Sequence, residues 1–221
     1  MYEEERPSDP IRDTAPENPP SDDARAAPGR LELVREFINT ADLEPGEDEL
    51  TDLPALTAWL RKRRLIGARE RLETGDLERA LEVREALRRV LADRGAGEAI
   101  EERAIRTLNS HPACAQMRVR FDGAGAPRLE PVGHGFEGAL AELFAIIEHA
   151  ASDGSWGRLK VCADHGCRWA FYDNSKNRSR SWCNMAVCGN RAKAREFRRR
   201  RRAGEGESPP ASSASTPPAL G

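Results

Sequence analysis

The chain has 221 residues with a formal net charge of −2 at pH 7, and 33% of its residues are charged. This length fits one domain of moderate size plus a smaller unit, and the lack of any apolar run of about 18 residues predicts no membrane-spanning helix and no membrane partner. Because the N-terminal stretch MYEEERPSDPIRD is acidic and lacks the apolar region of a secretory signal, we expect a cytoplasmic protein whose clustered cysteines bind metal or act in redox chemistry rather than form disulfides.

Four regions follow one another along the chain. Residues 1–29 hold six prolines and eight acidic residues with almost no large apolar side chain, so they cannot bury enough surface to offset the cost of ordering and predict a disordered tail. A body over residues 30–157 is long enough for its own core. A small module follows over residues 158–202, and residues 203–221 predict a second disordered tail because they are rich in Pro, Ser and Ala.

The first part of the body predicts three helices, because apolar residues recur there at helical spacing. The segment RLELVREFINTAD places Leu31, Val34, Phe37 and Ile38 on one face. In LTDLPALTAWLRKRRL, Thr51 or Asp52 is the expected N-cap, with Pro54 in the first turn. The third segment, GDLERALEVREALRRVLADRG, is expected to stop at Gly95.

A change of pattern follows a shorter predicted helix over residues 98–108. MRVRF alternates between apolar and polar residues, DGAGAP is rich in turn formers, and RLEPV is a second short run, which together predict one β-hairpin. FEGALAELFAIIEHAA then returns to helical spacing. The expected fold class is therefore mainly α with one small β-hairpin in the body, followed by a small β-hairpin plus helix at the C-terminus.

One charged residue, Arg84, falls at the spacing of the apolar face of its helix. A buried guanidinium must extend to solvent, pair with an acid or contact an anionic ligand. We favour an internal ion pair, and the alternative is that Arg84 lines a ligand-binding pocket.

Four of the five cysteines fall within 27 residues near the C-terminus. Cys162 and Cys167 form one C-x4-C pair, and Cys183 and Cys188 form a second pair after a gap of fifteen residues. Two such turns favour a closed, structural four-cysteine zinc site with one Zn²⁺. The alternatives are unrelated structural cysteines, a redox switch or an iron–sulfur cluster. His165 lies inside the first pair as an alternative ligand, although an exposed turn residue is the favoured interpretation.

The same region is strongly basic. Residues 158–202 contain 14 Lys and Arg against 3 Asp and Glu, a net charge of +11, so the rest of the chain has 21 against 34, a net charge of −13. This asymmetry predicts an anionic partner for the basic segment alone. A basic loop over 174–181 and a helix expected to start at Arg191, after Asn190 as N-cap, supply the candidate nucleic-acid-binding residues Lys176, Arg178, Arg180, Arg191, Lys193, Arg195, Arg198 and Arg199. The alternative is a solvated charge run.

The small module contains four closely spaced aromatic residues, namely Trp169, Phe171, Tyr172 and Trp182. We interpret them as its small core, and a platform for base stacking is the alternative. The zinc-dependent folding of so short a module is expected, because it lacks room for a large apolar core.

The cysteine pairs and the residues between them resemble the CGNR-type zinc finger, named for Cys188, Gly189, Asn190 and Arg191. The matching pattern is C-x4-C-x-W-x-F-Y-D-x-S-x-N-R-S-R-x-W-C-x-M-A-V-C-G-N-R-x-K, over about 159–195. In that family the finger usually follows a mostly helical ABATE domain, and the segments EFINTAD, LTAWL and ALEVREALRRVL resemble it. Two departures are Ser181, where another Arg is expected, and Ala170, where a larger apolar residue is expected.

The resemblance implies a regulator of the stress-induced bacterial transcription type. It implies that Cys162, Cys167, Cys183 and Cys188 bind zinc, that the finger binds DNA, and that the body senses a small ligand. The alternatives are an RNA- or ribosome-associated module and an enzyme housed in the body. The last is disfavoured because His111, His134 and His149 show no metal-binding spacing, and Cys114 is interpreted as a lone thiol. The ligand, the DNA site and the oligomeric state do not follow from the sequence.

Overall fold

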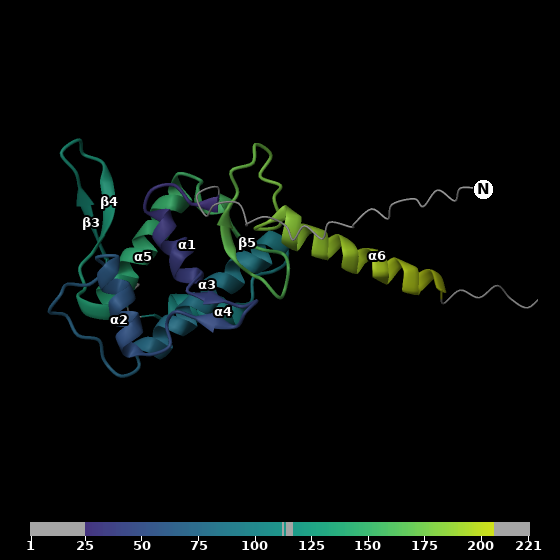
Figure 1. Cartoon of the computed structure of the whole chain (residues 1–221). Coiled ribbons are helices and arrows are strands. Elements are labelled where there is room, and N and C mark those ends of the chain that lie inside the picture. The colour runs from purple at the N-terminus through teal and green to yellow at the C-terminus, as the bar shows by residue number, and fades with distance from the viewer. Residues whose placement is uncertain (1–24, 112, 114–116, 206–221) are drawn as a thin grey trace, which may run out of the picture.

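The computed structural model describes residues 25–111, 113 and 117–205 (Figure 1). The tails predicted over 1–29 and 203–221, and Cys114, fall largely or wholly outside these residues. The elements in chain order are α1 (Leu31–Ile38), β1 (Ala41–Asp42), β2 (Glu47–Asp48), α2 (Leu53–Lys62), α3 (Asp76–Ala96), α4 (Glu102–Asn109), β3 (Met117–Phe121), β4 (Pro127–Pro131), α5 (Gly135–Ser152), a 3₁₀ turn η3 (Trp156–Arg158), β5 (Leu159–Val161), β6 (Ala170–Tyr172), a π-helical turn η4 (Met185–Gly189) and α6 (Asn190–Glu205).

This architecture confirms the expected class, mainly α with small hairpins. The strands of the described residues form three separate two-stranded antiparallel sheets, β1 with β2, β3 with β4 and β5 with β6. In Figure 1 the β3–β4 hairpin lies at one end of the molecule, and α6 projects from the other. The described helices include none that is both long enough and apolar enough to cross a membrane.

The core of the body forms where α1, α3 and α5 meet, because each helix turns an apolar face toward the others. Val34 and Ile38 of α1 are fully buried beside Leu140 of α5 and Leu91 of α3. From α1, the ring of Phe37 packs 5.6 Å, between centroids, from that of Trp59 in α2. The helical spacing read in the sequence therefore identified the faces that meet.

The helix ends differ from expectation at two places. The N-cap of α2 is Asp52, whose carboxylate accepts the amide N–H of Ala55, as expected. By contrast, α3 runs through Gly95 and ends at Gly97, which adopts the left-handed conformation with φ 70°. The following helix covers Glu102–Asn109 rather than 98–108. Two glycines lie within three positions, and the sequence does not show which one has the positive φ of a C-cap.

The first strands of the basic module complete the core of the body. Leu159, Val161, Ala170 and Tyr172 belong to the same buried cluster as α1, α3 and α5. Asn39, at the end of α1, donates to the carbonyl of Ala170 at 2.9 Å and accepts its amide N–H at 2.7 Å. This pair of bonds imitates a strand ladder and fixes β6 against α1. The C-terminal module is thus anchored to the helical body through both apolar and polar contacts.

Candidate metal centre and nucleic-acid interface

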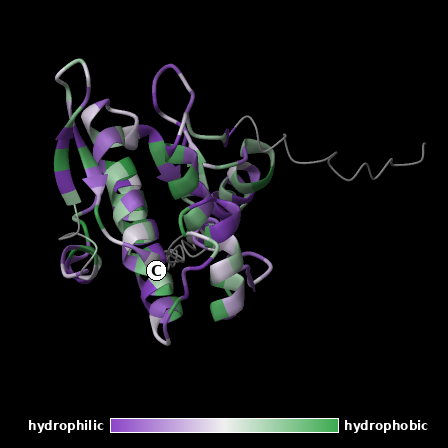
Figure 2. Cartoon of the chain, turned by 90° about the vertical axis from the view of Figure 1, so that its left-hand side faces the viewer, coloured by the Kyte–Doolittle hydropathy of each residue, from purple (hydrophilic) through white to green (hydrophobic). Residues whose placement is uncertain are grey.

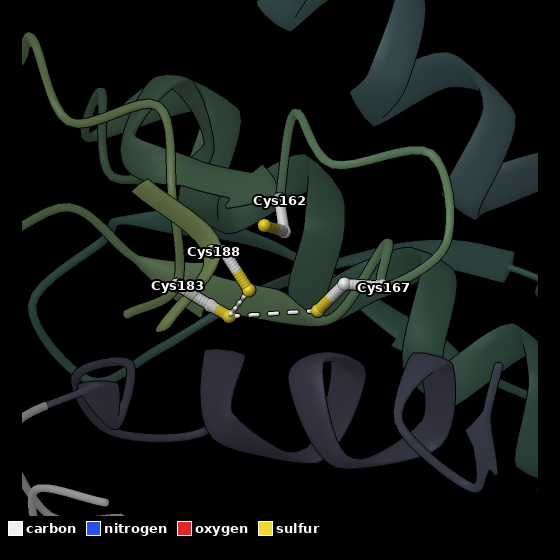
Figure 3. Close-up of side chains that lie close together, drawn as sticks. All are labelled: Cys162, Cys167, Cys183 and Cys188. Carbon is white, nitrogen blue, oxygen red and sulfur yellow. Dashed lines mark hydrogen bonds between the residues drawn. The ribbon is translucent and has the colours of Figure 1, made fainter. Parts of the chain in front are cut away.

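The four clustered cysteines come from two turns that lie against each other. Cys162 directly follows β5, Cys167 closes the first turn, and Cys183 and Cys188 lie just before and within η4. All four side chains are buried, and their sulfur atoms lie within 4.8 Å of one another. Figure 3 shows the four side chains converging on one point. The sequence prediction that both C-x4-C pairs meet is confirmed.

The spacing of the sulfur atoms matches a single tetrahedral zinc ion. Zinc–sulfur bonds of about 2.3 Å in a tetrahedron place the sulfur atoms about 3.8 Å apart. The Sγ atoms of Cys167 and Cys183 are 3.6 Å apart, and those of Cys183 and Cys188 are 3.8 Å apart. Disulfides are excluded among these four, because an S–S bond is about 2.05 Å long and all four are free thiols.

The protonation of the cluster also calls for a cation. Hydrogen bonds from Cys167 and Cys183 lower the pKa of Cys162, whereas the bond to Cys162 raises the pKa of both Cys167 and Cys183. One thiolate therefore suppresses the ionisation of its neighbours. A divalent ion removes this conflict, because it stabilises every coordinating thiolate. The donor set, the spacing and the burial together fit one structural zinc.

The backbone around each turn is fixed by its own polar contacts. In the first turn, the carbonyl of Asp164 accepts the amide N–H groups of Cys167 and Arg168, both at 3.0 Å. In the second, the side chain of Asn184 accepts the amide N–H groups of Ala186 and Val187. Asn184 is therefore the cap of the second turn.

The expected cap Asn190 is wrong. It already lies inside the continuous helical run and donates to the carbonyl of Ala186 at 2.9 Å. Gly189 does not act as a tight-turn glycine either, because it lies within η4 and its φ is not positive. A Cβ at this position would meet the end of the flexible, partly exposed Met185 side chain, which can move aside.

The aromatic residues divide between two cores. Phe171 is fully buried beside the cysteines, and Trp169 and Trp182 pack partly buried against the same cluster. Tyr172 belongs instead to the core of the body, because neighbouring strand residues face opposite sides of a sheet. The small-core interpretation therefore holds for three of the four. His165 is exposed, lies 2.7 Å from Arg168 and is not one of the clustered ligands, as expected.

Two family models match this chain. The CGNR zinc finger matches residues 158–201. ABATE, described as a putative stress-induced transcription regulator, matches residues 31–153, which are 123 of the 221 residues. The chain belongs to the ABATE family. A search of curated proteins gave no match.

In this ABATE family member, a buried carboxylate forms hydrogen bonds that stabilise the basic loop after β6. Asp173 is fully buried and accepts from Lys160 Nζ at 2.7 Å, from the Ser175 hydroxyl at 2.6 Å and from the Arg180 amide at 3.0 Å. Burial raises the pKa of Asp173, but these bonds outweigh it and lower that pKa to about 2. Lys160 also donates to the carbonyls of Arg178 and Arg180.

These bonds give the loop a defined backbone conformation. The side chains of Lys176, Arg178 and Arg180 are exposed, and Arg178 has a left-handed backbone with φ 52°. A non-glycine residue in this conformation is uncommon and persists where its surroundings fix it. The bonds from Lys160 and Asp173 supply that restraint, so the loop presents its cations in a defined arrangement.

Arg191 differs from the other candidate cations because its guanidinium is engaged within the fold. It donates two hydrogen bonds to Glu44, in the turn between β1 and β2, and one to the sulfur of Cys188 at 3.4 Å. Its Nε lies 3.4 Å from the buried carboxylate of Asp164, which also lies 3.3 Å from Arg195. Both Arg191 Nε and Asp164 Oδ2 lack a hydrogen bond of good geometry, so this contact is an ion pair only.

The remaining cations lie along α6. Lys193 and Arg198 are exposed, and Arg199 and Arg200 share Glu196 as a partner on the surface of the helix. Beyond its first turns α6 extends away from the body (Figure 1). This 16-residue helix has a single carboxylate over 190–202. It is therefore a strongly basic helix attached to the zinc site.

Arg84 is placed by the structure in an internal ion pair. It is 4% exposed and binds both carboxylate oxygens of Asp48, at 2.8 and 2.7 Å, and the hydroxyl of Thr40. Burial disfavours its charge, but these partners outweigh burial and raise its pKa. The favoured interpretation is thus observed, and ligand binding by Arg84 stays a prediction.

The three histidines of the body differ in exposure. His134 and His149 are exposed. His111 is buried, and burial lowers its pKa. It accepts the amide N–H of Ala113 at Nδ1, whereas its Nε2 has no hydrogen-bond partner. The expectation of a surface or satisfied histidine is therefore met by two of the three.

Proposed function

We propose that this ABATE family member is a zinc-containing regulator that binds DNA through its C-terminal finger. The observation that carries this proposal is the attachment of a basic helix to a zinc-fixed turn beside a restrained basic loop. The charge of residues 158–202 is +11, and a zinc ion with four thiolates adds −2, so about +9 remains. Such a surface favours a polyanion.

Two kinds of contact are expected from this surface. Lys193, Arg198 and Arg199 on α6 contact phosphates, where Arg suits bidentate bonding. Arg178 and Arg180, held by Asp173 and Lys160, contact base edges, because readout of sequence needs side chains on a fixed support. Arg191 and Arg195 contact phosphate only in competition with Glu44 and Asp164, so they contribute chiefly to orientation.

A second candidate ligand is single-stranded RNA. Phe197 is 63% exposed in the midst of the arginines of α6. Exposed aromatic rings interleaved with basic side chains are typical of surfaces on which unpaired bases stack. If RNA is the ligand, Phe197→Ser weakens binding to single strands by about 5- to 150-fold, which corresponds to stacking of about 1–3 kcal/mol per base. The same change leaves duplex DNA binding nearly unchanged.

The ABATE body, in this proposal, senses a small ligand and alters the affinity of the finger. The protein acts in the cytoplasm, where its thiols stay reduced, and it acts by binding rather than by catalysis. Measurement of affinity for a library of duplexes identifies the preferred DNA site. Binding that does not depend on the DNA sequence would contradict the regulator proposal. The absence of any DNA binding at low salt would contradict it as well.

A further inference from the structure

The β3–β4 hairpin has one apolar face and one charged face. In its register, Met117 pairs with Pro131, Val119 with Leu129 and Phe121 with Pro127. Directly opposed residues lie on the same side of a sheet, so these six apolar residues form one face. The intervening residues are Arg118, Arg120, Arg128 and Glu130. This alternation can be followed along the hairpin in Figure 2.

Much of the apolar face is exposed to solvent rather than packed against the body. No residue of β3 or β4 belongs to the buried core clusters of the described residues. Val119 is 59% exposed and Phe121 is 65% exposed. An isolated two-stranded hairpin is marginal in water without a covered face, so the exposed part of this apolar face is a candidate binding surface.

A recess of about 730 Å³ lies in that position. Val119 and Leu129 form its wall on the hairpin side, and Ile146 of α5 and Leu31 of α1 contribute apolar surface from the body. This volume falls within the range of about 300–1,000 Å³ typical of small-molecule sites.

The charges around the recess select the ligand. Of its two lining arginines, Arg30 is paired with Glu142, and Arg128 lies 3.4 Å from Asp122. The exposed residues Glu148, His149 and Asp153 also line it. In the part of the chain that the structure describes, neither carboxylate forms an ion pair within 4 Å. Glu148 accepts from Ser152, and Asp153 accepts from Ser155, which lowers the pKa of Asp153 and keeps it anionic at neutral pH. The charge of His149 also acts on Asp153 and lowers its pKa.

From the apolar walls and the unpaired carboxylates, we propose that this recess binds a lipophilic organic cation, a compact apolar molecule with one positive charge. The inference rests on the ligand-sensing part of the proposed function and specifies both the place and the chemistry of the ligand. It does not depend on DNA binding, because the hairpin and α6 lie at opposite ends of the molecule (Figure 1).

Titration calorimetry of the full chain with tetraphenylphosphonium tests the proposal, with tetraphenylborate as the anion of matched shape. We expect saturable 1:1 binding of the cation. Val119→Lys places a like charge in the recess and should weaken binding at least tenfold. Phe121→Lys is the matched control, since it is equally exposed on the same face but does not line the recess, and it should change the affinity less than twofold.

A second pair of variants tests the charge. Glu148→Gln with Asp153→Asn should weaken binding of the cation at least fivefold, whereas Glu98→Gln with Glu102→Gln, exposed elsewhere, should not. Circular dichroism checks that each variant is folded.

Four results would overturn the proposal. These are no saturable binding of the cation by the parent chain, equal loss in the two hairpin variants, no loss on neutralising the two recess carboxylates, and a parent dimer that Val119→Lys dissociates. The last would assign the face to a second copy of the chain. DNA affinity measured on the same variants separates these outcomes from a failure of the DNA-binding proposal.

Discussion

Arg191, at the start of α6, grips the carboxylate of Glu44 with two hydrogen bonds of 2.7 and 2.8 Å across 147 residues of sequence. The arginine is the last residue of the CGNR motif, and the glutamate lies in the β1–β2 turn of the ABATE body. The hydrogen bond from Arg191 lowers the pKa of Glu44, so the bond is complete at neutral pH. This pair joins the first turn of α6 to the ABATE body.

Glu44→Gln should loosen α6 while leaving the rest of the fold intact. Both side chains are partly exposed, so the free energy of unfolding should fall by only about 0.2–1 kcal/mol. Amide hydrogen exchange should accelerate in residues 190–197 but not in α3. Glu47→Gln, an exposed glutamate in the same small hairpin, is the control. Unchanged exchange in α6 would show that the zinc turn alone orients the helix.

Cys183→Ser should release the zinc ion, because three ligands cannot complete the closed site. The second turn and α6 should lose order, since their anchor is the metal. The body should stay folded but melt at a lower temperature, because Leu159 and Tyr172 link it to the zinc region. Elemental analysis and thermal melting measure the two effects. Cys114→Ser should leave the zinc content at one per chain, and iron or no metal in anaerobically purified parent would refute the assignment.

Asp173→Asn should destabilise the basic loop. The pKa of Asp173 is about 2 in the folded chain, below its ordinary value of 3.8, so its charge stabilises the fold by about 2 kcal/mol. This contribution is complete above pH 4 and is lost as the pH falls toward 2. The difference in stability between parent and variant should therefore be constant from pH 5 to 7. A difference no larger than that of Glu102→Gln, an 89% exposed control, would contradict this role.

Asp48→Ala should destabilise the body strongly, because it leaves the buried guanidinium of Arg84 without its main partner. Loss of one member of a buried ion pair costs about 3–5 kcal/mol, and partial exposure of Asp48 reduces this to about 2–3 kcal/mol. Urea denaturation measures the change. The double variant Arg84→Met with Asp48→Ala should recover part of the loss. If the double variant is no more stable than the single one, the unpaired charge is not the cause.

The sequence alone predicts those parts of the fold that a local pattern of residues determines. The faces of α1 and α5, the β3–β4 hairpin and the meeting of the four cysteines follow from spacing alone. Asp52 and Pro54 mark the start of α2 because a helix N-cap and a first-turn proline are also local signals. The closed four-thiolate centre could be predicted because its ligands lie in two short turns that only need to fold against each other.

What the sequence did not predict depends on contacts between distant segments. Glu44 as the partner of Arg191, and Asn39 as the partner of β6, become neighbours only through the packing of the whole chain. Asp173 offered a weak local signal, because an Asp two residues before a Ser often caps a turn. The sequence predicts Asn190 as a helix cap because nothing local reveals that the helical run begins earlier, at Met185, with Asn184 as its cap.

The salt dependence of DNA binding tests the central claim of a phosphate-contacting helix fixed to the zinc site. For the full, zinc-loaded chain with about four to six phosphate contacts, log affinity plotted against log salt should have a slope of about −4 to −5. Replacing the five arginines of residues 198–202 with Ser should flatten this slope and weaken binding to all sequences. The matched control replaces five exposed arginines elsewhere, Arg69, Arg103, Arg106, Arg118 and Arg120, and should retain the parent slope to within about one unit. Equal affinity and slope for the five-Ser variant and the parent would contradict the account.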